Sequence, residues 1–409
     1  MLFVWGPASA AMYLSWDGRR EAADGRIQQA YAQWLNAGEL VPWDPTYPVV
    51  AGFYLLRLRQ AADSPAQARQ LTETAHRHFQ TAVVLAPNDA NFRYNLGHIS
   101  LMLDQPERAQ QALGRATQLA PRNVLYHYYW LARAYQRQDR MEAAVTALTL
   151  QGLVDPQFLT LPLWSNPELA PLQAPVLQRT LSHLEALLAA MPTGHRHYNA
   201  LYERILLLRW WHDRPLPPIK RERLTPAAYV ALLGEREPQA AIARLNRELA
   251  QVEGPQQPPE LLLLRAWLDL QQYLDAYRQA QRSSTRAGES QPIPDLGRRI
   301  RQHRDFKAWL RSVEPQPRQF QTTNLGAYTY RNRNIAINPL IPDGVGLYPL
   351  AQRTGLYAAA TNFPAIFPRL DRRIDRLRSE RLGLPHPTAR SGSRFEIPEQ
   401  RSRAASGKP

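Results

Sequence analysis

The histidines are the first candidates for metal chemistry, and four of the ten occur as two close pairs. His76 and His78 form one pair, and His195 and His197 form the other. Residues two apart on a helix point in nearly opposite directions, whereas a zinc-binding pair on a helix needs a spacing of four. The chain also has no cysteine, which excludes disulfides, thiol nucleophiles and cysteine-ligated metals. We therefore expect no metal and no cofactor.

The motifs that organise catalysis in many enzymes do not occur in this sequence. It has no glycine-rich phosphate loop, no G-x-S-x-G turn and no H-E-x-x-H motif. Asp371 and Asp375 are a candidate pair of carboxylates, but they lie among arginines. Their spacing of four is typical of salt bridges along a helix rather than of acid–base catalysis. We therefore expect a protein that is not an enzyme.

Positive charge is concentrated at the end of the chain. Residues 296–409 hold 21 basic and 8 acidic side chains, which gives +13 of the total net charge of +15. Within them, residues 367–382 predict a helix with leucine and isoleucine on one side. The other side carries six arginines, namely Arg369, Arg372, Arg373, Arg376, Arg378 and Arg381.

The arginine side of this predicted helix admits three interpretations. It can be a solvated face, a surface for an anionic lipid or a lipid-linked glycan, or a nucleic-acid surface. No RNP, KH or helix-turn-helix pattern accompanies it, so nucleic acid is not the expected partner. The candidate residues for an anionic surface are Arg369, Arg372, Arg373 and Arg376.

The elements that must position these groups are indicated by an internal repeat. An alanine is followed by a bulky residue four positions later, a third core position three later, and a proline five beyond that. The four occurrences are Ala30–Trp34–Ala37–Pro42, Ala75–Phe79–Ala82–Pro87, Ala109–Leu113–Ala116–Pro121 and Ala144–Leu148–Gln151–Pro156. The last three prolines are 34 and 35 residues apart. This period predicts stacked helical hairpins, in which these residues form the core.

The first helix of each hairpin is indicated by a small residue. Gly97 and Ala132 each lie twelve positions before the alanine that opens the second helix. The hairpin that ends at Pro42 has no convincing first helix unless Met1–Trp16 supplies it. That stretch has no charge before Asp17. It is either the end of a membrane helix, which its Trp and Tyr residues favour, or an apolar helix that packs on the repeat.

The repeat resembles the tetratricopeptide repeat (TPR), W-x2-L-G-x2-Y…A-x3-F…A-x2…P, with Tyr94-Asn95-Leu96-Gly97 in the first helix. The resemblance implies an all-α fold, an α-solenoid of TPR helical hairpins. We expect a degenerate helical continuation after them and a basic, partly irregular C-terminal region. First helices usually line the concave face, where a protein partner binds. The candidate contacts there are Asn91, Arg93, Tyr94, Asn95, His127, Tyr128 and Arg133.

A second resemblance is carried by Trp43-Asp44-Pro45-Thr46-Tyr47-Pro48, which precedes the repeats. Residues 1–160 look like the soluble C-terminal region of cyanobacterial-type O-antigen ligase and polymerase proteins. In that family a membrane domain that transfers lipid-linked glycan precedes an external TPR domain. The resemblance implies that Met1–Trp16 ends the last membrane helix and that the chain is part of a larger membrane protein. The membrane domain has no counterpart here, so no catalytic residue is carried over.

Two functions follow from these patterns. The first is a non-enzymatic scaffold associated with the membrane in the cell envelope, as an accessory region of a ligase or polymerase. The alternative is a cytoplasmic TPR adaptor that binds peptide segments of a partner protein. The expected organisation is an apolar segment at 1–18, TPR hairpins at 19–160, further hairpins at 161–313, a basic irregular region with one helix at 314–385, and a disordered tail at 386–409.

Overall fold

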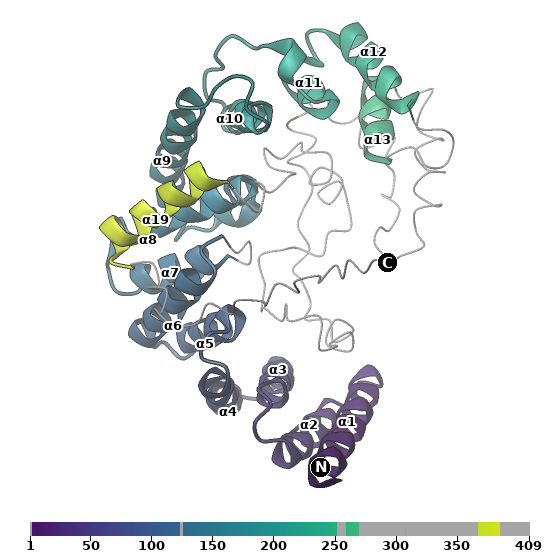
Figure 1. Cartoon of the computed structure of the whole chain (residues 1–409), viewed down its shortest axis with the longest axis vertical. Helices are drawn as coiled ribbons and strands as arrows, with labels where there is room; N and C mark the ends of the chain where they lie inside the picture. Colours follow the sequence, from purple (N-terminus) through teal and green to yellow (C-terminus); the bar gives the residue numbers. More distant parts are fainter. Residues whose placement is uncertain (1, 123–125, 252–258, 270–306, 308–366, 385–409) are drawn as a thin grey trace, which may run out of the picture.

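The computed structural model describes residues 2–122, 126–251, 259–269, 307 and 367–384, and the structure given below is that of these residues. They form a curved array of α-helices in which α1, α3 and α5 lie on the inner side (Figure 1). The helices of the array are α1 (Leu2–Ala23), α2 (Ile27–Leu40), α3 (Thr46–Gln60), α4 (Pro65–Leu85), α5 (Ala90–Met102), α6 (Pro106–Leu119), α7 (His127–Gln136), α8 (Met141–Val154), α9 (Ala170–Ala189), α10 (Tyr198–Trp211), α11 (Pro226–Leu233), α12 (Pro238–Leu249) and α13 (Pro259–Leu268).

The first eight helices pair as four successive hairpins, in the order that the repeat predicts. Each second helix ends two residues before one of the repeat prolines, Pro42, Pro87, Pro121 or Pro156. A proline cannot donate the backbone hydrogen bond that would continue a helix, and it restrains the residue before it away from helical geometry. The predicted all-α solenoid is confirmed.

The repeated alanines and bulky residues form the core between the hairpins. Ala30, Ala75, Ala109 and Ala144 are fully buried. The bulky residues that follow them are buried as well, namely Trp34, Phe79, Leu113 and Leu148. An alanine lets the backbone of one helix approach the next, and the bulky residue then fills the groove beside it.

The apolar N-terminal stretch supplies the first helix of the first hairpin. α1 packs along α2, with Ala11 and Ser15 buried. It continues past residue 18 to Ala23. That Met1–Trp16 forms the end of a membrane helix stays a prediction. Among the described residues, none of the helices is both long and apolar enough to traverse a bilayer.

The helical array continues beyond the four hairpins. Within the region predicted to hold further hairpins, α10 follows α9. Thr225 caps α11 and Pro238 begins α12. Most of the stretch 270–313 and the tail expected at 386–409 lie outside the described residues.

The last described helix, α19 (Pro368–Leu382), returns to the middle of the array and packs on α8 (Figure 1, yellow). Its apolar residues Leu370, Ile374 and Leu382 are buried there, and Gly383 ends it in the left-handed conformation with φ 64°. The helix predicted at 367–382 is confirmed. One assignment within it is wrong, because Arg378 was expected on the polar side and is fully buried.

Candidate functional site

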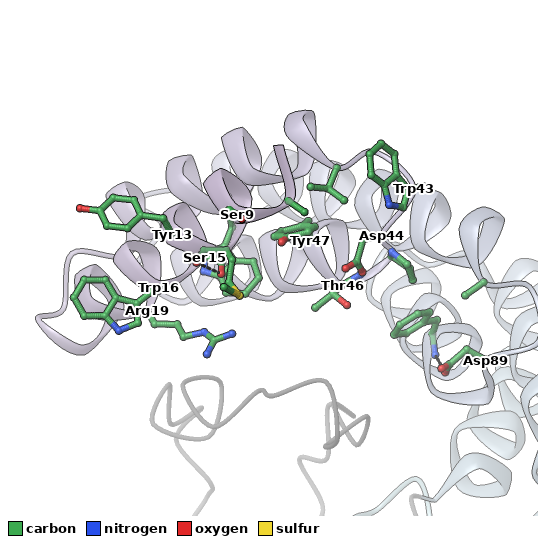
Figure 2. A pocket seen from close by; sticks show the side chains of 17 residues that line it. Ser9, Tyr13, Ser15, Trp16, Arg19, Trp43, Asp44, Thr46, Tyr47 and Asp89 are labelled. Carbon is green, nitrogen blue, oxygen red and sulfur yellow. Dashed lines mark hydrogen bonds between the residues drawn. The ribbon is translucent and has the colours of Figure 1, made fainter. Parts of the chain in front are cut away.

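A cavity of about 1040 Å³ lies where the first two hairpins meet (Figure 2). Helix α1 forms one wall, and the turn between α2 and α3, with the start of α3, forms the other. Asp89 and Phe92, at the beginning of α5, close one end. The cavity therefore belongs mainly to the inner helices, which are the helices that the repeat predicts to carry a binding face.

Aromatic side chains dominate the cavity wall. Tyr13 and Trp16 lie at one end and Trp43 at the other, with Tyr47 between them (Figure 2). The rings of Tyr13 and Trp16 are 6.3 Å apart, and Tyr47 lies 5.7 Å from the buried ring of Trp34. Trp16 is 56% exposed and Trp43 is 58% exposed. Exposed tryptophans in a concave site are typical of surfaces that bind another molecule.

The cavity carboxylates accept backbone hydrogen bonds at the beginnings of helices. Asp44 accepts a 2.8 Å hydrogen bond from the backbone N–H of Thr46, at the start of α3. Asp89 is the N-cap of α5 and accepts bonds from the N–H groups of Asn91 and Phe92, at 2.8 and 3.1 Å. Because a carboxylate at this position stabilises the helix, these two residues have a structural role. We therefore do not assign Asp44 and Asp89 as an acid–base pair.

Arg19 is the cation of the cavity. Its guanidinium lies 5.6 Å from the centre of the Trp34 ring, within the range of a cation–π contact. Its Nε is buried and has no hydrogen-bond acceptor in the part of the chain that the structure describes. The arrangement offers apolar contact, stacking and one positive charge, which suits binding rather than bond-breaking chemistry.

The residues predicted to line the concave face are largely part of the core. Tyr94, Asn95, His127 and Tyr128 are fully buried, so they offer no surface to a partner and the prediction is corrected for them. Tyr94 stacks on His127 at 4.8 Å between ring centres. The reason is that these positions face the neighbouring helices of the array.

The other three predicted residues keep some exposure, but each makes local contacts. Arg93 donates to the backbone oxygen of Pro87 at 2.7 Å, and Arg133 forms an ion pair with Glu168. Asn91 is half-buried beside the cap of α5. None of the seven residues lines the cavity. A partner contact at these three positions stays a prediction.

The four arginines predicted to bind an anionic surface lie on α19 with different environments. Arg372 and Arg376 are exposed, and Arg376 is 3.9 Å from Glu380. Arg369 donates to the backbone oxygen of Ala190, at the end of α9. Arg373 is half-buried and contributes, after burial, to lowering the pKa of His183. Binding of an anionic lipid or glycan at these residues stays a prediction.

The sequence interpretation did not name the cavity residues as a site. Two signals could have found them. The segment Trp43–Pro48 was the distinctive piece of the second resemblance, and its residues 43–47 line the cavity. Met12, Tyr13 and Trp16 are large apolar side chains of α1 that are exposed, which a helix that only packs on its neighbour does not require.

No cluster of three or more potential metal ligands occurs among the described residues. The two histidines of the pair His76 and His78 contact different residues. His76 meets Ser100 at 3.2 Å, and His78 meets the hydroxyl of Tyr31 at 3.2 Å. Each histidine of this pair therefore has its own polar neighbour on another helix.

A family model described as a tetratricopeptide repeat matches residues 78–111. This stretch covers the last eight residues of α4, all of α5 and the first part of α6. The match and the helical array together support a TPR-type solenoid and, with it, a role in protein interaction. A search of the curated proteins gave no significant match. The resemblance to the O-antigen ligase and polymerase family therefore stays a prediction.

Proposed function

We propose that this chain is a non-enzymatic scaffold that binds a segment of a partner protein in the aromatic cavity between its first two hairpins. The observation that carries the proposal is the pair of exposed indoles, Trp16 and Trp43, at opposite ends of one cavity. Truncating such side chains typically removes most of the affinity of an interface, because they bury a large area with few rotatable bonds.

The chemistry of the cavity favours a segment with a large apolar side chain. The polar groups Asp44, Asp89 and Ser15 are already hydrogen-bonded within the protein. A ligand that relied on them would have to displace those bonds. An aromatic or long aliphatic side chain instead gains contact with the rings and loses little hydration.

The setting in which the scaffold acts has two versions. As an accessory region in the cell envelope, it would hold a partner close to the membrane, which is what the resemblance around Trp43–Pro48 implies. As a cytoplasmic adaptor, it would act in solution. Fractionation of the native host separates them: retention in carbonate-washed membranes supports the first, and complete release supports the second.

The binding proposal is tested with peptides selected on the full chain from a random library. A chain with both Trp16→Ser and Trp43→Ser should bind the selected peptides about tenfold more weakly or worse, a loss of about 1.4 kcal/mol or more. A chain with Val84→Ser is the matched control, because Val84 is 78% exposed on α4 and does not line the cavity. Equal affinity of the double variant and the control would overturn the proposal.

A further inference from the structure

We propose that α8 presents a helix-binding groove, that α19 fills this groove as a separable latch, and that a second copy of the α19 segment can take its place. The proposal concerns a surface away from the aromatic cavity and is independent of the function proposed for it. It commits to one occupant, the segment of this chain that the structure shows seated on α8.

The first observation is that α8 lacks the exposed row that its sister helices keep. In α6, Glu107, Arg108 and Gln111 face solvent. In α4, Thr81 and Val84 do the same. In α8, every residue from Ala144 to Val154 is buried. A helix that is uncharged and buried on every side needs cover all round, and α19 packs on the side that the neighbouring hairpins leave open.

The second observation is the pattern of α19 itself. Its buried residues recur every four positions, at Leu370, Ile374, Arg378 and Leu382. One narrow stripe therefore meets α8, while the remaining positions are half-buried or exposed. A helix with so small an apolar face gains its stability from docking rather than from its own sequence.

Arg378 lies in the centre of this stripe and is fully buried. Its Nη1 donates to Asp375 of the same helix at 3.1 Å, while Nε and Nη2 have no acceptor within the described residues. The counter-ion, Asp375, belongs to α19 itself, so the release of α19 does not leave an uncompensated charge in the array. Burying an arginine that is only partly satisfied offsets part of the apolar gain, which makes this contact easier to release than the hairpin core.

Two contacts fix the direction and register of α19 on the array. Asp371 lies 3.3 Å from Arg122, in the turn after α6. Arg369 donates to the backbone oxygen of Ala190, which caps the end of α9. The latch therefore touches the neighbours of α8 on both sides. The hairpins themselves are joined by contacts that do not involve α19, so the array keeps its own packing when the latch leaves.

The test uses a labelled peptide of residues 367–384 added to the full chain. In the Ile374→Asp chain, the covalently attached α19 should leave the groove. The peptide should then bind the variant chain at least about tenfold more tightly than it binds the wild-type chain. A peptide that carries Ile374→Asp should not bind either chain. Equal binding to both chains, or no binding to the variant chain, overturns the proposal.

A second pair of variants covers the case in which Ile374→Asp fails to fold. The chain has no cysteine, so Gly114→Cys with Leu384→Cys reports docking alone. A β-carbon at position 114 would lie 3.2 Å from Cδ2 of Leu384. Asp371→Arg should lower the yield of the cross-link, and Arg122→Asp added to it should restore the yield. A yield that the first change leaves intact, or that the second does not restore, contradicts the proposed latch.

Discussion

Gly18 of α1 lies directly against the indole of Trp34 in α2, because a β-carbon at position 18 would be 2.7 Å from Cδ1 of that ring. The same relationship recurs in the third hairpin. There a β-carbon at Gly97 would be 2.4 Å from Cγ of Leu113. In both hairpins the missing side chain makes room for the bulky residue of the repeat, and the two helices approach closely as a result.

The first prediction tests this close approach with Gly18→Val. The added side chain must displace the Trp34 ring, so we expect the free energy of unfolding to fall by about 1–3 kcal/mol. The measurement is the midpoint and slope of urea unfolding. Gly6→Ala is the matched control in α1, because nothing lies within 4 Å of a β-carbon at position 6. That change should leave stability equal or raise it by up to about 1 kcal/mol. A stable Gly18→Val chain would contradict the packing of α1 on α2.

The contact between Gly18 and Trp34 corresponds to a spacing that the sequence already contains. Gly18 precedes Ala30 by twelve residues, the offset that placed Gly97 and Ala132 in the first helices of later hairpins. This offset predicts the first helix of the first hairpin, and α1 continues past the uncharged stretch to Ala23.

The second prediction concerns Gln151, which takes the position held by alanine in the other three hairpins. It is fully buried, and neither its amide oxygen nor its amide nitrogen has a hydrogen-bond partner among the described residues. Gln151→Met keeps the approximate volume and removes the desolvated amide. We expect the free energy of unfolding to rise by about 1–3 kcal/mol.

The matched control for that change is Gln111→Met on α6, where the side chain is exposed. Here we expect stability to change by no more than about 0.5 kcal/mol. Both variants are compared with the parent chain by chemical denaturation. Loss of stability in Gln151→Met would mean that the amide is satisfied in solution, and would contradict the packing described for α8.

The hairpins could be predicted from the sequence, but the binding residues could not. The offsets within the repeat report local geometry, and they correctly gave the core at Ala75, Ala109 and Ala144. They do not report which side of a first helix meets the next hairpin, and Tyr94 and His127 proved to be covered.

The position of α19 depends on a contact between residues that are far apart in the sequence. Its amphipathic pattern predicts a helix, but no local rule says that it docks on α8, far earlier in the chain. The absence of charge from Ala143 to Val154 in α8 was the one hint, because a second helix of a hairpin normally keeps a polar row. The helical periodicity also predicts Arg378 on the solvent side, together with the other arginines of this helix. Its place among leucines and isoleucine depends on a contact that periodicity does not reveal.

The third prediction separates capping from ligand binding at Asp89. Asp89→Ala removes the acceptor for the N–H groups of Asn91 and Phe92, and should lower the free energy of unfolding by about 1 kcal/mol. Asp89→Asn keeps an acceptor and removes the charge. We expect it to change stability by only a few tenths of a kcal/mol and to leave affinity for cavity-binding peptides unchanged. Weaker peptide binding by Asp89→Asn would show that the carboxylate contacts the ligand.

The fourth prediction is a loss of stability in mild acid that originates between α5 and α7. Burial lowers the pKa of His98 to about 4 and that of His127 to about 3, from an ordinary value of 6.5. The His98 ring lies 4.1 Å from that of Trp130. Well above pH 6.5 neither the folded nor the unfolded chain takes up a proton at these residues, so the pH dependence of stability there does not come from them.

Below pH 6.5 the unfolded chain binds protons at both histidines and the folded chain does not. The free energy of unfolding should therefore fall by up to about 1.4 kcal/mol per pH unit for each histidine, down to pH values near the folded-state pKa of each. Urea unfolding at pH 7, 6 and 5 measures the slope. His127→Phe keeps the stacking on Tyr94 and removes one titrating group, so its slope should be smaller than that of the parent chain by up to about 1.4 kcal/mol per pH unit over this range. An unchanged slope in that variant would contradict the lowered pKa of His127.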